Sequence, residues 1–143
     1  MATELDHSFS TEKSVDDNFE AITDLERVIP AVEGGSVTET TGPDSVKAQI
    51  IMKMGAMSMK MQGTVEVVEK DADANRAVLR VKAREAGGQG HANADVTFQL
   101  NDGGGTIHTH AQITGKAASM GEGAVAGFLD GMITDFATKL GQI

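Results

Sequence analysis

The chain has 143 residues, 40% of them hydrophobic, which is enough for one domain that buries about two thirds of its unfolded surface. It has no cysteine, which excludes disulfides, thiolate metal sites and cysteine nucleophiles, and its formal net charge of -9 argues against nucleic acid as a partner. No apolar run reaches the ~18 residues of a membrane span and the acidic start MATELDHSF is no signal peptide, so we expect a cytoplasmic protein.

Residues 1–45 predict one strand, short helices and a second strand. Residues 5–10 alternate between apolar and polar side chains, as a strand does. Ser14 and Asp17 have the spacing of a capping box, and apolar residues at helical spacing then predict one or two short helices over 15–29. After Gly34-Gly35 we expect a short strand at 36–41.

A methionine-rich stretch, IMKMGAMSMKM, occupies residues 51–61. Apolar side chains share one parity from Val46 to Met54, and the parity flips after Gly55-Ala56. An uninterrupted strand cannot do this, because a one-residue slip turns every side chain to the other face, so Gly55-Ala56 is a turn or a bulge. Both methionine runs can then point to the same side, where they face a core, a ligand or a partner.

Three further strands and a long helix complete the pattern. Alternation predicts strands over 77–83, 92–100 and 107–113, separated by turn sequences rich in Gly, Asn and Asp. Apolar residues at i, i+3, i+4 and i+7 predict a helix over 125–140 with a wide apolar stripe. The predicted fold is therefore α+β, a curved antiparallel sheet of about six or seven strands around a long C-terminal helix.

The charge is unevenly spread, with 11 acidic and 2 basic side chains in residues 1–45 but 5 acidic and 8 basic ones in residues 46–85. The basic middle is either an interaction face or, more often, the solvated face of a sheet. Strand parity predicts that its basic residues lie on the outer face.

Pairing the predicted strands through their turns places small residues at the middle of the inner face, with Ala94 opposite both Val81 and Ala111. Facing them, the helix carries glycines at four-residue spacing, at positions 123, 127 and 131. Each glycine costs about 1 kcal/mol of helix stability relative to alanine. Either the helix packs closely on the sheet, or the small residues leave a void for a flat molecule with the methionines as an adaptable wall.

The inward-facing positions carry little chemistry. They include no acid pair, no Ser–His–Asp set and no lysine, and His7 and Thr109 are the inward polar candidates. We interpret His7 as a hydrogen-bonded strand residue. Catalysis needs groups that move protons or stabilise charge, whereas an apolar cavity with few polar groups is a binding site. We therefore predict no catalytic residue.

A metal site is the alternative interpretation of two surface histidines. His108 and His110 have the i, i+2 spacing that lets two strand residues share a face, and Asp95 pairs opposite His110. The same register, however, sets Arg80 opposite Asp95, so an ordinary ion pair accounts for the acid. We predict no metal site here.

Four stretches resemble the CoxG family of carbon monoxide dehydrogenase subunits: TDLERVIPAVEGG (23–35), GTVEVVEKD (63–71), NRAVLRVKAREAGGQGHANADVTFQL (75–100) and GGTIHTHAQITGKAASMG (104–121). The resemblance covers nearly the whole chain. It implies a helix-grip fold of the START-like (SRPBCC) superfamily, with residues 1–143 forming a single ligand-binding domain that has a hydrophobic cavity. Met-Gly-Ala followed by methionines stands where the family usually has Val-Gly-Pro and bulkier residues.

The resemblance also implies a cellular setting, in which the protein works with a molybdenum-containing carbon monoxide dehydrogenase at the inner face of the cytoplasmic membrane. In that family a C-terminal extension often serves as a membrane anchor. This chain stops at Ile143, so we expect that tail to be absent or to have been removed.

We therefore expect a non-enzymatic protein that binds a hydrophobic, membrane-derived small molecule. A CO-oxidising enzyme must pass electrons to the respiratory chain, so an isoprenoid quinone, menaquinone or ubiquinone, is the first candidate ligand, with no covalently bound cofactor. The alternatives are a membrane-recruitment adaptor with a filled core and a START-like small-molecule enzyme. The predicted ligand-binding residues are Met52, Met54, Met57, Met59, Met61, Leu79, Val81, Ala94, Val96, Phe98, Ala111, Ile113, Val125, Phe128, Leu129, Met132 and Phe136.

Overall fold

The computed structural model describes residues 2–88, 90–115 and 118–143, apart from the side chains of Met54 and Met57. The elements, in chain order, are β1 (Ala2–Ser10), α1 (Val15–Thr23), α2 (Leu25–Val28), the 3-10 turn η1 (Ile29–Ala31), β2 (Gly35–Gly42), β3 (Ser45–Met54), β4 (Met57–Asp71), β5 (Arg76–Glu85), β6 (His91–Asn101), β7 (Gly104–Ile113), η2 (Ala118–Met120) and α3 (Glu122–Leu140).

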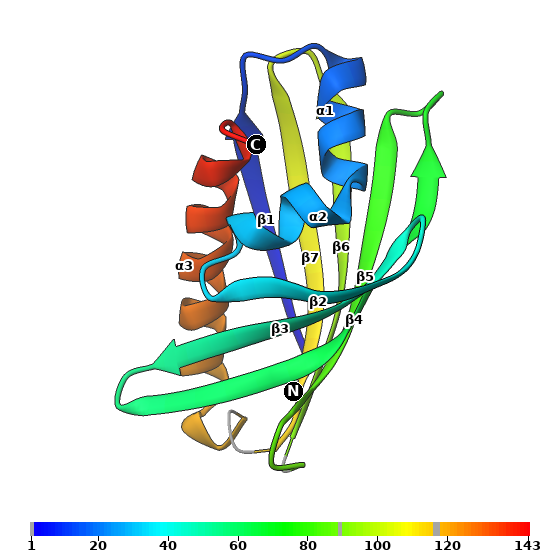
Figure 1. Cartoon of the computed structure of the whole chain (residues 1–143). Coiled ribbons are helices and arrows are strands. Elements are labelled where there is room, and N and C mark those ends of the chain that lie inside the picture. The colour runs from blue at the N-terminus through cyan, green and yellow to red at the C-terminus, as the bar shows by residue number, and fades with distance from the viewer. Residues whose placement is uncertain (1, 89, 116–117) are drawn as a thin grey trace.

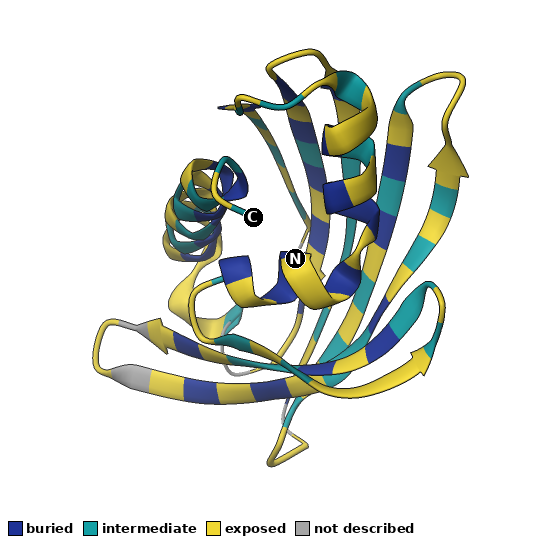
Figure 2. Cartoon of the chain, turned by 45° about the horizontal axis from the view of Figure 1, so that its top comes forward, coloured by how far each residue is buried: buried dark blue, intermediate teal, exposed yellow. Residues whose placement is uncertain are grey.

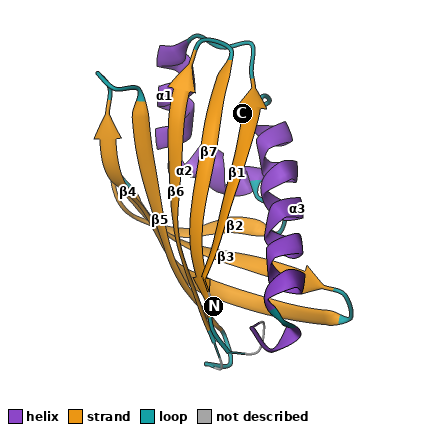
Figure 3. Ribbon diagram, turned by 180° about the vertical axis from the view of Figure 1, so that it is seen from behind, coloured by secondary structure: helices purple, strands orange, loops and turns teal. Residues whose placement is uncertain are grey.

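The strands form one seven-stranded antiparallel sheet in the order β1-β7-β6-β5-β4-β3-β2. Strands β2 to β7 follow one another as a meander, and β1 closes the far edge by pairing with β7. The sheet curves strongly, so that β2, β3 and β4 sweep across below α2 (Figure 1). Figure 2 shows α1 and α2 lying inside this curve, and Figure 3 shows α3 running along the β1 edge. The predicted helix-grip arrangement is confirmed.

Local sequence signals set the element boundaries. The Ser14 hydroxyl oxygen accepts a hydrogen bond from the backbone N–H of Asp17 at 3.2 Å, which is the predicted cap of α1. Buried Asn18 donates from its side-chain amide to the carbonyl of Asn101 at 3.0 Å, tying α1 to the β6–β7 turn. Met54 pairs with Met57 in the antiparallel β3–β4 ladder, so the parity flip at Gly55-Ala56 is a hairpin turn and not a bulge, and Gly55 supplies the positive φ of +62° that such a turn needs.

One glycine in β4 is required by a close approach between strands. A Cβ added at Gly63 would collide with the carbonyl oxygen of Lys82 in β5. Glycine inside a strand often marks such a contact or a tight bend. The long β4 strand can therefore follow the curve of the sheet without losing its pairing to β5.

The core consists of two neighbouring clusters. The first surrounds Phe98, whose ring contacts Phe9 and Phe136 edge-to-face at centroid distances of 6.5 and 6.3 Å. The second contains the methionines Met52, Met59 and Met61 together with Ala111, Ile113, Val125 and Leu129. The described part of the methionine hairpin thus faces the interior from both strands, as the parity flip predicts.

The helix glycines do not pack on the small residues at the middle of the sheet, so the predicted position of these glycines is wrong. Gly127 and Gly131 are exposed, and a Cβ added at either would meet no atom outside its own stretch of helix within 4 Å; the same holds for Gly123. The reason is the rotation of α3. Its buried face contains Val125 and Leu129, and a residue two positions away lies about 200° around the helix. Close helix–sheet packing therefore does not explain these glycines.

The outer face of the sheet is charged, as predicted. The side chains of Lys60, Arg80, Lys82 and Arg84 are exposed there. Lys53 is also exposed, but it lies in a groove beside α3 and not on the outer face, which corrects its predicted position.

Candidate functional site

An apolar cavity of about 170 Å³ lies between the concave face of the sheet and the helices. Its floor comes from strands β3 to β7. The register of these strands confirms the predicted pairs, with Ala94 opposite Val81 on one side and Ala111 on the other, and Val96 opposite Thr109. Small side chains at the middle of the floor leave the space that larger residues would fill.

The roof of the cavity comes from two separate helical segments. Helix α3 contributes Leu129, Met132, Ile133 and Phe136. The α2–η1 segment and the residue that follows it contribute Val28, Ile29 and Val32, which sequence reasoning missed. Their helical spacing marks an apolar stripe, but spacing alone does not show which part of the sheet the stripe covers.

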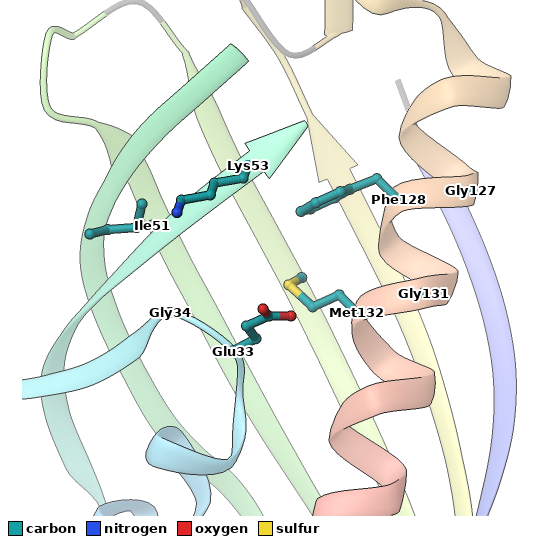
Figure 4. A pocket seen from close by; sticks show the side chains of 8 residues that line it. All are labelled: Glu33, Gly34, Ile51, Lys53, Gly127, Phe128, Gly131 and Met132. Carbon is teal, nitrogen blue, oxygen red and sulfur yellow. The ribbon is translucent and has the colours of Figure 1, made fainter. Parts of the chain in front are cut away.

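A second compartment lies beside the cavity. It is a groove of about 570 Å³ between α3 and β3, lined by Glu33, Gly34, Ile51, Lys53, Gly127, Phe128, Gly131 and Met132. In Figure 4 the side chains of Phe128 and Met132 project from α3 toward β3. The exposed glycines form the helical wall of this groove, so the groove uses the space that their missing side chains leave open.

Met132 lines both the groove and the cavity. Methionine is unbranched and has three rotatable side-chain bonds, so it adapts its shape easily. The methionines of the cavity wall, Met52 and Met61, add further adaptable surface.

The volumes define what each compartment can hold. Ligand pockets usually measure about 300–1,000 Å³, whereas an apolar cavity of about 150 Å³ holds one benzene molecule. The inner cavity matches one small ring, and the groove falls in the range of a larger ligand. The wall of the groove combines the charged side chains of Glu33 and Lys53 with the apolar side chains of Ile51, Phe128 and Met132.

The cavity wall is nearly free of polar side chains. Thr109 is 4% exposed and lines the cavity, and its hydroxyl has no hydrogen-bond partner among the described residues. The other polar lining residue, Asn93, is exposed. The remaining lining residues are all apolar.

The second inward polar candidate has a different environment. His7 Nε2 lies 2.8 Å from Asp130 Oδ1, a contact that links β1 to α3, while its buried Nδ1 has no partner among the described residues. His7 is not part of the cavity wall. It contributes to holding the long helix on the sheet edge.

The surface histidines and Asp95 have ordinary polar partners, with His108 beside Asp6, His110 beside Glu4 and Asp95 paired with Arg80. Arg80 Nε donates to Asp95 Oδ1 at 2.9 Å, as predicted, and this hydrogen bond holds the pKa of Asp95 below its usual value. His108 Nδ1 lies 2.7 Å from Asp6 Oδ1, and the hydrogen bond to that carboxylate raises the pKa of His108. Within residues 2–88, 90–115 and 118–143, no three His, Asp or Glu side chains are grouped to hold a metal ion.

Most of the predicted ligand-binding residues line the cavity. Phe128 lies instead in the groove, and Met59 and Val125 pack in the adjoining methionine cluster without lining the cavity. Met54 and Met57 lie outside the described side chains. The cavity-lining residues that were predicted are Met52, Met61, Leu79, Val81, Ala94, Val96, Phe98, Ala111, Ile113, Leu129, Met132 and Phe136.

None of the helices in the described part of the chain has the length and apolar character needed to cross a membrane.

Solved structures share this fold across nearly the full chain. A conserved protein from Geobacillus kaustophilus is 22% identical, with a TM-score of 0.80, over 99% of this chain and 93% of its own. A START superfamily protein from Mycobacterium smegmatis is 10% identical, with a TM-score of 0.62, over 97% and 94%. The Zhui aromatase/cyclase from Streptomyces sp. R1128 is 12% identical, with a TM-score of 0.55, over 96% and 87%. At these identities the likeness shows the fold alone.

None of the curated proteins compared with the chain matches it. The family model of CoxG, a carbon monoxide dehydrogenase subunit, matches residues 8–142. This match covers the strands and helices that build the cavity and the groove. The chain therefore belongs to the CoxG family of carbon monoxide dehydrogenase subunits.

Proposed function

We propose that this protein binds a membrane-derived apolar molecule with a ring at one end and a hydrocarbon chain at the other, and does not transform it. The observation that carries the proposal is the apolar cavity beside a groove, with Met132 shared between them. The ring occupies the cavity, and the chain lies in the groove over Gly127 and Gly131. An isoprenoid quinone, menaquinone or ubiquinone, is the first candidate.

The family supplies the setting for this proposal. Its members are described as subunits of carbon monoxide dehydrogenase, and the oxidation of carbon monoxide releases electrons that a membrane quinone can carry away. We place the protein beside the dehydrogenase at the inner face of the cytoplasmic membrane. There it takes up a quinone and supports electron transfer from the enzyme.

The lining residues favour binding over catalysis. General acid–base catalysis requires a group that transfers a proton within hydrogen-bond reach of the ligand. The cavity wall, where the ring lies, offers one buried hydroxyl, that of Thr109, and no carboxylate, imidazole or amine among the described residues. The charged side chains of Glu33 and Lys53 line the groove, beside the hydrocarbon chain. The Zhui aromatase/cyclase shows that proteins of this fold also include enzymes, so the fold itself does not decide the question.

A pure adaptor with a filled core is less well supported. A core that serves only stability is packed with few voids larger than a water molecule, whereas this one contains about 170 Å³ of apolar space. The exposed basic face of the sheet remains available for docking to the dehydrogenase in either case.

Two measurements test the proposal. Organic extraction of the purified protein followed by mass spectrometry should recover a quinone or another lipid. Thermal unfolding with a short-chain ubiquinone or menaquinone should show a raised midpoint. A ligand at 100 times its dissociation constant adds about 2.7 kcal/mol of stability, or roughly 5–10 °C for a chain of this size.

Two matched variants test whether the quinone-induced rise of the unfolding midpoint comes from binding in the cavity. Ala94→Leu fills the cavity floor and should abolish the quinone-induced shift while the protein stays folded, since the added carbons enter empty space. Ala124→Leu makes the same change at an exposed position of α3 and should preserve the shift. An unchanged shift in Ala94→Leu, or no extracted lipid and no shift in the parent protein, contradicts the proposal.

A further inference from the structure

The hydroxyl of Thr109 is an unusual feature of the cavity. Thr109 lies at the centre of β7, paired with Leu5 on one side and Val96 on the other, and 4% of its surface is exposed. Its side chain lines the apolar cavity, and its Oγ1 is buried with no partner among the described residues. A buried hydroxyl without a hydrogen bond is costly, whereas a valine of the same shape would leave no polar group unpaired.

Water is a poor partner for this hydroxyl. A buried water needs two to four polar groups around it. Apart from Thr109, the buried side chains of the cavity wall are apolar. The hydrogen-bonding capacity of Thr109 is therefore still free for a ligand that enters the cavity.

We propose that Thr109 is the specificity-determining residue of the site and selects a ring that bears an oxygen substituent. This inference rests on the proposed binding function and adds the chemistry of the buried end of the ligand. A threonine hydroxyl carries one donor and two acceptor lone pairs. It donates to a ring carbonyl and accepts from a ring hydroxyl, so it pairs with both the oxidised and the reduced form of a quinone-like ring.

Two probes of equal shape isolate this contact. In 1,2,4,5-tetramethylbenzene, methyl groups replace the two oxygens of 2,5-dimethyl-1,4-benzoquinone. The affinities of both are measured by titration against the parent protein, Thr109→Val and the control Thr106→Val. Thr106 is an exposed residue on the same strand, so its substitution leaves the cavity unchanged.

The expected result is a selective loss of affinity. In Thr109→Val the quinone should bind about 3- to 10-fold more weakly, the range of one neutral hydrogen bond. The hydrocarbon should bind equally well or better, and Thr106→Val should behave as the parent does. Ligand-free Thr109→Val should unfold at the same temperature or a few degrees higher, because it removes an unpaired buried polar group.

The outcomes separate this inference from the proposed function. If both probes bind the parent and Thr109→Val equally well, the role of Thr109 is overturned while ligand binding stands. A ligand-free Thr109→Val that unfolds several degrees lower overturns the inference as well, because the hydroxyl would then have a partner in the fold. If neither probe nor any quinone binds the parent, the inference and the proposed function fail together.

Discussion

Replacing the exposed helix glycines with alanine should stabilise the protein. Gly127 and Gly131 lie inside α3, where glycine is less favourable than alanine by about 0.8–1 kcal/mol per residue. Apart from its own stretch of helix, a Cβ at either position would meet no atom within 4 Å, so no packing penalty offsets the gain. The double variant Gly127→Ala/Gly131→Ala should therefore gain about 1.5–2 kcal/mol, which corresponds to roughly 3–8 °C in the unfolding midpoint.

Thermal unfolding of the ligand-free protein measures this gain directly. Gly63→Ala is the matched control, because its Cβ would collide with the Lys82 carbonyl, and it should lower the midpoint. A double variant that is less stable than the parent would show that the helix glycines pack against another part of the protein, and the groove would lose its physical basis.

The same helix position also tests the division between groove and cavity. Gly131→Leu places a bulky side chain in the groove while the protein stays folded, since the position is open to solvent. It should weaken binding of a quinone with an isoprenoid chain and leave binding of 2,5-dimethyl-1,4-benzoquinone nearly unchanged. Equal weakening of both ligands would contradict the assignment of the chain to the groove.

Two further predictions concern the charged surface. Because its contact with Asp6 raises the pKa of folded His108 above the ordinary value of 6.5, the pair stabilises the fold fully below about pH 6.5. That stability is lost as the pH rises through the raised pKa. The free energy of unfolding of the parent relative to His108→Gln should therefore fall over this pH range, by under about 1 kcal/mol because the pair is exposed. A parent advantage that grows with pH would contradict the assignment. Changing Lys53, Lys60 and Lys82 together to glutamate should shift the unfolding midpoint by no more than a few degrees, because all three side chains are exposed. A large drop of the midpoint would show that these residues are needed for the fold.

The sheet could be predicted from the sequence in detail because short turns and alternation fix its register. The turn at Gly55-Ala56 accounts for the parity flip in the methionine hairpin, and the neighbouring turns place Ala94 opposite Ala111. In an antiparallel meander each turn determines which residues face each other. The small-residue floor of the cavity follows from this pairing.

The rotation of the long helix could not be predicted in the same way. Its apolar residues cover a wide arc, so several rotations about the helix axis would bury an apolar face. Packing against β1 and η1, which are distant in sequence, determines which rotation is adopted. The four-residue spacing alone predicts that Gly127 and Gly131 face the middle of the sheet, whereas they line the groove beside β3. The contribution of Val28 to the cavity roof was missed for the same reason.

Thr109 shows what sequence and structure each contribute to the site. Strand parity is enough to predict that its side chain points inward. Whether an inward hydroxyl has a partner depends on every neighbouring side chain and backbone group, and only the folded structure provides that information. The unpaired hydroxyl is therefore a feature that pattern alone could not find.

The central claim, that the cavity takes up a ring-bearing ligand, is tested most directly by NMR of methionine methyl groups. In protein labelled with methyl-¹³C methionine, the methyl signals of Met52, Met61 and Met132 report on the cavity wall, and exposed Met120 serves as an internal control. Titration with 2,5-dimethyl-1,4-benzoquinone should shift the three cavity signals in a saturable way and leave Met120 unchanged. If the cavity signals stay fixed, or if Met120 shifts as much as they do, the account of this protein as a carrier of a buried ring is contradicted.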